Sequence, residues 1–286
     1  MQNNKTIFVT GVTGNQGGAV ARNLIASGFA VRGLTRSIAS EKAHMLSNLG
    51  VKLVQGDLDR PDSYREYLEG VDGVFSVQSF DNGVEKEIKE GIALAELSLQ
   101  MRVPHFIYSS TAGCDLNSGI PHWESKFKIE NHVRELGLPY TILRPTSLFE
   151  NYLIPQPRKQ LLKGKLISPI DKEVVQLLVA SEDIGRVAAK ILMSPEEYRA
   201  RTLTLASEVL DLSQIAQIFS QTMHREIRVG KLPAFITRLV MGKNLYAMFQ
   251  WINTEGAALE RLTIDHDVLT KQLSLAEWSA LHFKPV

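Results

Sequence analysis

A run of glycines near the N-terminus has the spacing of a phosphate-binding turn. The residues from Gly11 to Gly18 read GVTGNQGG and directly follow a short apolar run. Gly11 permits a tight turn, and Gly14 lets the backbone approach a pyrophosphate. Gly17 or Gly18 lets the following helix pack closely on the strand, with its N–H groups and dipole facing the phosphates. The turn therefore predicts a dinucleotide site, with expected contacts at Gly11, Thr13, Gly14, Asn15, Gln16 and Gly17.

The residues after the second apolar run bear on the choice of cofactor. Sites that prefer NAD usually carry an acidic residue there, which accepts a hydrogen bond from the ribose 2′-hydroxyl. This sequence has Arg36 instead, whose fork of donors suits a 2′-phosphate, and Lys42 adds charge if the loop folds back. The alternative is that Arg36 is a solvated loop residue. The pattern favours NADP(H), with NAD(H) as the second choice.

Two further segments follow predicted strands and face the same edge of a sheet. The carboxylate of Asp57 can meet the adenine amino group while Leu58 lines the adenine face. Equally, Asp57 can cap the helix that begins nearby. Gln78 directly follows the fourth apolar run. We include all three residues among the expected cofactor contacts.

The elements that position these residues alternate between short β-rich apolar runs and helical patterns. The expected strands are 6–10, 30–35, 51–54, 73–77, 105–109 and 140–143. The expected helices are 17–27, 40–49, 63–68, 85–101 and 122–135. This alternation is typical of βαβ units, and near-continuous apolar strands indicate a sheet buried on both faces. We predict an α/β fold with a Rossmann-like, doubly wound parallel sheet.

The pattern becomes less regular after about residue 149, where prolines punctuate a loop-rich stretch. A strand at 173–179, a helix at 181–193 and a strand at 201–205 follow, and the last strand is able to return to the sheet. The rest reads as mainly helical, with aromatic residues that each suit a core or a dimer face. We predict a cofactor domain at 1–150, its sheet completed by part of 173–206. A smaller, partly interleaved substrate or partner domain is predicted at 151–286.

Composition narrows the classes of function. The formal net charge is +1 with no block of like charges, which argues against direct nucleic-acid binding. The single cysteine, Cys114, excludes an internal disulfide and a Cys-rich zinc site. The histidines lack metal-ligand spacing and no Gly-x-Ser-x-Gly elbow is present, so neither a metal site nor a hydrolase is expected. With no membrane-length apolar run and no signal-like N-terminus, we expect a cytoplasmic protein that does not bind membranes.

Several of these segments together resemble the NmrA-like family, an atypical branch of the short-chain dehydrogenases/reductases. The segments are 11–18, 34–37, 54–59, 122–126, 143–151 and 181–185, and the resemblance extends to about Met193. It implies a Rossmann-like NADP(H) domain and a small C-terminal domain with a cleft between them. Ordinary members of the superfamily use a Tyr-x-x-x-Lys pair and a serine near the end of the fifth strand.

This chain keeps the lysine of that pair, Lys126, but has His122 where tyrosine is expected. Residues four apart share a helix face, so the resemblance implies that Lys126 bonds the nicotinamide ribose beside His122. A histidine can supply a proton near neutral pH, but a nearby ammonium and a position at the helix start both disfavour its charged form. The alternative, in which His122 packs at the helix terminus, stays open. Ser109, Ser110 and Thr111 offer a hydroxyl, and Ser110 is our catalytic candidate with Lys126 and His122.

Two functions fit this sequence. One is an NADPH-dependent reductase of a small carbonyl or quinone-like acceptor, because a quinone relaxes the need for a strong protein acid. The other is a non-catalytic NADP(H) sensor that acts through a regulatory protein partner, which the missing tyrosine favours. We lean to the reductase. The sequence is compatible with a monomer or a homodimer.

Overall fold

The central sheet is built from short strands whose residues alternate between two buried faces. The computed structural model describes residues 5–269 and 271–283. The strands are β1 (Thr6–Val9), β2 (Ala30–Thr35), β3 (Lys52–Gln55), β4 (Gly73–Ser76), β5 (Phe106–Ser109), β6 (Tyr140–Pro145) and β10 (Arg201–Leu205). They form one seven-stranded sheet in the order β10-β6-β5-β4-β1-β2-β3, with every pair parallel. The predicted α/β Rossmann-like fold is confirmed.

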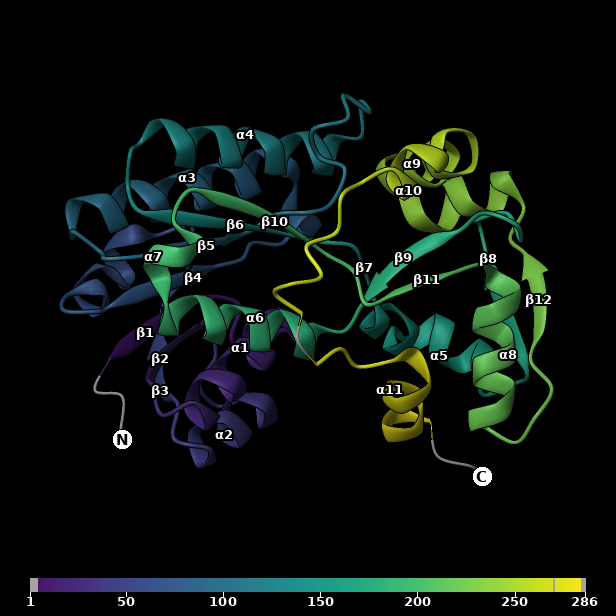
Figure 1. Ribbon diagram of the computed structural model, residues 1–286, viewed down its shortest axis with the longest axis horizontal. Coiled ribbons are helices and arrows are strands. Elements are labelled where there is room, and N and C mark those ends of the chain that lie inside the picture. Colours follow the sequence, from purple (N-terminus) through teal and green to yellow (C-terminus); the bar gives the residue numbers. More distant parts are fainter. Residues whose placement is uncertain (1–4, 270, 284–286) are drawn as a thin grey trace.

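Helices cover both faces of this sheet, as the apolar strands require. Ile7 and Val9 pack in one core with α1 (Asn15–Ala26), α2 (Glu41–Asn48) and α6 (Ser181–Met193). Phe8, which points the other way, packs in a second core with α3 (Val84–Gln100) and α4 (Pro121–Glu135). In Figure 1, α3 and α4 lie above the sheet and α1, α2 and α6 below it. The carboxyl ends of the strands are therefore left as the edge that carries the site.

Two predicted helices differ in detail from the structure. The helix expected at 63–68 is a pair of 3₁₀ turns, η1 (Pro61–Ser63) and η2 (Arg65–Leu68). The first helix begins at Asn15 rather than at residue 17, because Gly14 is already in an extended conformation as its N-cap. Two other short helices are η3 (Phe80–Asn82), between β4 and α3, and α7 (Pro195–Tyr198) before β10.

The C-terminal region contains more strand than the sequence indicated. Its helical elements are η4 (Phe149–Leu153), α5 (Pro155–Leu161), α8 (Leu212–Thr222), α9 (Ala234–Glu255), α10 (Ala257–Glu260) and α11 (Leu275–His282). Its strands are β7 (Ser147–Leu148), β8 (Lys165–Ser168), β9 (Gln176–Val179), β11 (Glu208–Leu210) and β12 (Arg228–Lys231). They form a three-stranded sheet, β11-β9-β7, and a two-stranded sheet, β12-β8. The strand expected at 173–179 is thus β9, and it lies outside the main sheet.

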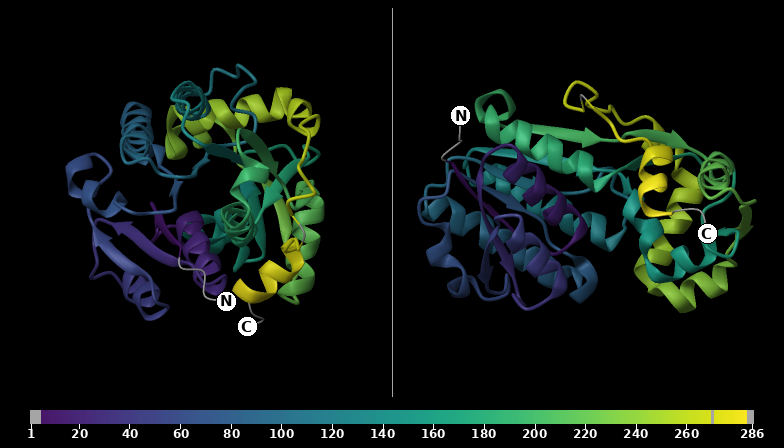
Figure 2. Two further views of the ribbon diagram at one scale, coloured as in Figure 1. Left: turned by 60° about the vertical axis from the view of Figure 1, so that its left-hand side comes forward. Right: turned by 90° about the horizontal axis from the view of Figure 1, so that it is seen from below.

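This region has its own core, in which Phe149, Phe219 and Trp278 are fully buried. The right-hand view in Figure 2 shows it as a lobe beside the N-terminal half of the chain. The chain leaves the main sheet after β6, forms β7 to β9 in the lobe, and comes back through α6 to β10, which pairs with β6. No helix among the described residues is both long and apolar enough to cross a bilayer.

Helix α1 is held between the sheet and α6 by two glycines. A Cβ on Gly17 would lie 2.4 Å from the carbonyl oxygens of both Thr10 and Gly11. On the other side of the helix, a Cβ on Gly185 of α6 would lie 2.6 Å from the carbonyl oxygen of Ala19. Separations below 3.0 Å require backbone movement, so both contacts exclude any side chain. The start of α1 is therefore fixed against the end of β1.

We predict that Gly17→Ala destabilises the protein by about 2 kcal/mol, because the added methyl group must push α1 away from backbone oxygens. The free energy of unfolding from urea titration measures the change. The matched control is Gly230→Ala on β12, where the nearest atom to a Cβ is 3.6 Å away, with an expected effect within about 0.5 kcal/mol. Equal effects of the two substitutions would contradict this account of α1.

Candidate functional site

The glycine turn joins β1 to α1 at the carboxyl edge of the sheet. Gly11 has a φ of +57°, a conformation that side chains disfavour. Gly14 is the N-cap of α1 and provides no side-chain hydrogen bond to the first helical amides. Gly11, Gly14 and Asn15 are exposed. The turn thus presents amides at a helix start, as phosphate binding requires, in a cradle that Cβ atoms would fill.

Hydrogen bonds connect this turn to the ends of the neighbouring strands. The hydroxyl of Ser109, at the end of β5, donates to Oε1 of Gln16 at 2.6 Å. The hydroxyl of Thr10 accepts from the amide of Val77 at 2.8 Å. Gln78 donates through Nε2 to the hydroxyl of Ser76 at 2.9 Å, but its buried Oε1 has no partner among the described residues. An unsatisfied buried oxygen next to the turn is an acceptor available to a ligand.

The residues expected at the adenosine end lie on loops that follow β2 and β3, where Arg36 is exposed and Asp57 and Leu58 are half-buried. Arg36 directly follows β2 and is exposed. Asp57 accepts through Oδ1 from the amide of Asp59 at 3.2 Å, and its own amide donates to Oγ of Ser63 at 3.0 Å. Asp57 therefore closes a short turn before η1, whereas Leu58 packs at the edge of the core under α3 and α4.

A hollow of about 380 Å³ adjoins the glycine turn on the side of α2 and α11. Its lining includes Thr13, Gly14, Asn15 and Lys42, together with Trp278. Lys42 of α2 thus lies beside the glycine turn. Arg36 does not line this hollow.

Lys126 is buried on α4 and is held by a carboxylate that we did not identify from the sequence. Its Nζ donates to Oε1 of Glu87 on α3 at 2.8 Å and lies 3.5 Å from the carbonyl oxygen of Gln78. Glu87 has no exposed surface. An ammonium has three donors, and these are its acceptors among the described residues, so one donor is left for a ligand.

His122, one helical turn before Lys126, is packed between aromatic rings. It is 5% exposed and stacks on Phe80 with ring centroids 4.5 Å apart. Burial first, and the ammonium of Lys126 second, lower the pKa of His122 to about 4. Its Nδ1 is buried and has no hydrogen-bond partner among the described residues. The imidazole is therefore neutral at physiological pH, so it can offer a hydrogen bond but is a poor source of a proton.

The aromatic packing continues from α4 into the C-terminal region. Trp123 lies edge-on to His122 at 6.4 Å and to Trp251 of α9 at 5.2 Å. Trp123 belongs to a small core with Cys114 and Ile120, against which part of α9 packs. Trp251 thus packs in a core against the start of α4, which is one of the two roles expected for the aromatic residues of the C-terminal region. No local signal in the sequence indicates Phe80.

Ser110 lies in a different environment from Lys126. Its hydroxyl is 3.6 Å from the sulfur of Cys114, which donates to Oε1 of Glu130 at 3.1 Å. Arg144 binds both oxygens of Glu130, at 2.9 and 2.7 Å. Burial and the Glu130 carboxylate raise the pKa of the Cys114 thiol to about 12, so this thiol is not a nucleophile. Ser109 rather than Ser110 faces the glycine turn.

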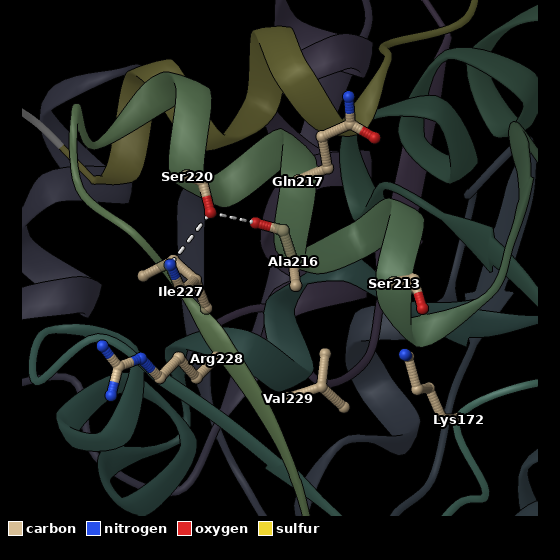
Figure 3. Close-up of a pocket in the computed structure, with 8 residues that line it drawn as sticks. All are labelled: Lys172, Ser213, Ala216, Gln217, Ser220, Ile227, Arg228 and Val229. Carbon is tan, nitrogen blue, oxygen red and sulfur yellow. Dashed lines mark hydrogen bonds between the residues drawn. The ribbon is translucent and has the colours of Figure 1, made fainter.

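A second hollow, of about 430 Å³, lies in the C-terminal region between α8 and β12 (Figure 3). Its lining includes Lys172 and Arg228, and none of the predicted site residues. Ser220 there donates to the carbonyl oxygen of Ala216 and accepts from the amide of Ile227. These bonds attach the segment before β12 to α8. Among the described residues, no cluster of three or more histidine, cysteine or acidic side chains has the arrangement of a metal site.

Comparison with known protein families identifies the chain. The model of the NmrA-like family matches residues 3–281. The chain belongs to the NmrA-like family. This confirms the resemblance stated from the sequence and extends it beyond Met193.

Individual relatives of this NmrA-like protein have different roles. The photosystem II assembly factor Ycf39 of Trieres chinensis is 26% identical over 271 residues, which cover 92% of this chain and 83% of that protein. The negative transcriptional regulator NmrA, solved with NADP, superposes with a TM-score of 0.78 at 22% identity, covering 99% and 96% of the two chains. The NADPH-dependent quinone oxidoreductase QOR2 of Escherichia coli, solved with NADPH, gives 0.79 at 21% identity, covering 97% and 100%. The structural likeness shows the fold.

We predict that Lys126→Met raises the pKa of His122, because removing a nearby positive charge favours the imidazolium. The pKa should stay below the usual value of about 6.5, since burial is the larger cause. An NMR titration of the imidazole, assigned with His122→Gln, measures it. Lys128→Met, which removes an exposed charge from the same helix, is the control. A pKa that stays at about 4 in Lys126→Met would show that burial acts alone.

Proposed function

We propose that this protein binds NADP(H) across the carboxyl edge of its sheet and reduces a small carbonyl or quinone-like acceptor. The observation that carries the proposal is a fixed ammonium, Lys126, with a stacked aromatic pair, Phe80 and His122, one helical turn away. The reduced cofactor supplies a hydride when bound. The chain's own residues bind it, orient it and provide a wall for the acceptor.

The cofactor assignment rests on residues that fit each part of a dinucleotide. The amides at the start of α1 suit the pyrophosphate. Exposed Arg36 suits a 2′-phosphate, and Lys42 adds a positive charge beside the glycine turn. The free donor of Lys126 suits the hydroxyls of the nicotinamide ribose. The orphaned Oε1 of Gln78 offers an acceptor between these ends. Both NmrA and QOR2 were solved with a dinucleotide bound, which agrees with this assignment.

The acceptor class follows from what the site lacks. A simple carbonyl needs a proton at its developing alkoxide, but His122 is neutral, and Ser110 is turned toward Cys114 and Glu130. A quinone spreads the added charge over its ring and takes its protons from water. Flat rings also stack well on aromatic side chains. We therefore favour a planar, quinone-like acceptor. The structural relative QOR2 is named as a quinone oxidoreductase.

A second candidate is a non-catalytic NADP(H) sensor that acts through a protein partner. The neutral, enclosed His122 in place of a tyrosine favours it, because such a site binds the cofactor without an efficient acid. The regulator NmrA shares the fold. A sensor also requires that oxidised and reduced cofactor stabilise different states.

We predict that Arg36→Asp weakens NADPH binding at least about tenfold and NADH binding by less than about threefold. The substitution replaces a donor to the 2′-phosphate with a repelling carboxylate, and each tenfold step corresponds to about 1.4 kcal/mol. Calorimetric titration with each cofactor measures both constants. Lys52→Asp, an exposed charge change at the start of β3, is the control. Equal losses for the two cofactors would contradict the assignment of Arg36.

We predict steady NADPH oxidation with at least one quinone from a panel of quinones and small carbonyls. Lys126→Ala should lower kcat/KM at least about tenfold, because it removes the donor to the nicotinamide ribose. Lys128→Ala is the matched control and should retain activity. Tight NADPH binding with no turnover of any acceptor would overturn the reductase. A partner captured in only one cofactor state would then support the sensor.

A further inference from the structure

Glu87 is a carboxylate in the middle of the fold whose two oxygens are both committed to one turn of α4. Its Oε1 accepts from Nζ of Lys126 at 2.8 Å, and its Oε2 accepts from the hydroxyl of Ser125 at 2.5 Å. Its side chain has no exposed surface, and that of Lys126 is 11% exposed. The neighbouring acid on α3, Glu85, is exposed. Glu87 is thus unlike the solvated Glu85 at the start of the same helix.

Because Glu87 is buried, its hydrogen bonds to Ser125 and Lys126 allow little change in the relative position of α3 and α4. A carboxylate removed from water costs several kcal/mol unless charged and polar partners replace the water. Here both partners come from consecutive residues of α4, so a shift of α4 along α3 would break both bonds together. The two helices also touch closely, since a Cβ on Gly91 of α3 would lie 2.7 Å from Ile129 of α4. The ammonium of Lys126 is therefore held at one position relative to the strand ends.

We propose that Glu87 is the positioning residue for Lys126 and so determines how tightly the nicotinamide half of the cofactor is held. This inference rests on the proposed function. The carboxylate directs one N–H of Lys126 into α3, which leaves a free donor pointing away from it. It also balances the charge, so that Lys126 contributes an oriented hydrogen bond rather than an isolated buried cation. Glu87 itself does not need to contact the cofactor, because both of its oxygens are bonded to α4.

The experiment compares two ligands that differ in the part Lys126 is expected to bind. NADPH contains the nicotinamide ribose, whereas 2′,5′-ADP contains the phosphorylated adenosine half alone. Calorimetric titration of the purified full chain should show that Glu87→Gln weakens NADPH binding about tenfold, as expected for the loss of one charge-assisted hydrogen bond. The same variant should change 2′,5′-ADP binding by less than about twofold. Glu85→Gln, the matched control on α3, should change neither.

A second experiment, in a protein that already lacks Lys126, separates a positioning role of Glu87 from a general loss of stability. In a Lys126→Met protein, adding Glu87→Gln should cause no further loss of NADPH affinity, because the residue through which Glu87 acts is gone. Glu87→Asp keeps the charge but draws it back by one methylene. It should weaken the binding of NADPH, to a smaller degree, and leave the binding of 2′,5′-ADP unchanged. This variant tests the inference if Glu87→Gln does not fold.

The outcomes are distinct. If the unmodified protein binds neither ligand, the proposed function fails and this inference fails with it. If the unmodified protein binds both ligands and the Glu87 variants weaken both alike, the carboxylate has a structural role only and the positioning role is overturned. A full additional loss in the Lys126→Met background would overturn it as well.

Discussion

The structure depends on the absence of a side chain at residue 17. Two backbone oxygens at the end of β1 lie 2.4 Å from the position that a Cβ would take, so α1 begins directly at the sheet edge. This brings its first amides level with the ends of β4 and β5. The Ser109 hydroxyl can then reach Gln16. Gly185 of α6 closes on the opposite side of α1, and the turn cannot move without moving the layer behind it.

Helix α4 is also held in one position, in its case by ion pairs rather than by close backbone contacts. Glu87 of α3 binds Lys126, and one turn further along α4 its own Glu130 binds Arg144 of β6 and Arg134. Fully buried carboxylates of this kind are stable only while their partners stay in place. Lys126 and Glu130 are four residues apart, so both networks act on the same side of α4. The result is a helix whose cleft-facing side chains are set by ion pairs rather than by packing alone.

Much of this arrangement was readable from the sequence because its signals are local. The spacing from Gly11 to Gly18 places a strand before it and a helix after it, and His122 and Lys126 share a face through simple helical geometry. Glu87 was not readable, because the sequence near residue 87 cannot show which residue of α4 it meets. The pairing of β8 with β12 joins residues 165–168 to 228–231, and no local alternation predicts such a distant match. The loss of charge on His122 was foreseen from Lys126, whereas its enclosure by Phe80 depends on a loop from another part of the sheet.

The path of the chain has a consequence for how this fold can be rebuilt. The edge strand β10 belongs to the Rossmann sheet but follows β7, β8 and β9 of the lobe in sequence. Val268 and Leu269, which follow most of the lobe, pack again into the core beneath α1 and α6. Neither half is therefore a continuous stretch of sequence. An exchange of lobes between relatives cannot be made at one junction, since a single crossover would separate α1 from the helix that supports it. Diversity in what such proteins recognise is more readily introduced by changes inside the lobe's loops and helices than by recombination of whole parts.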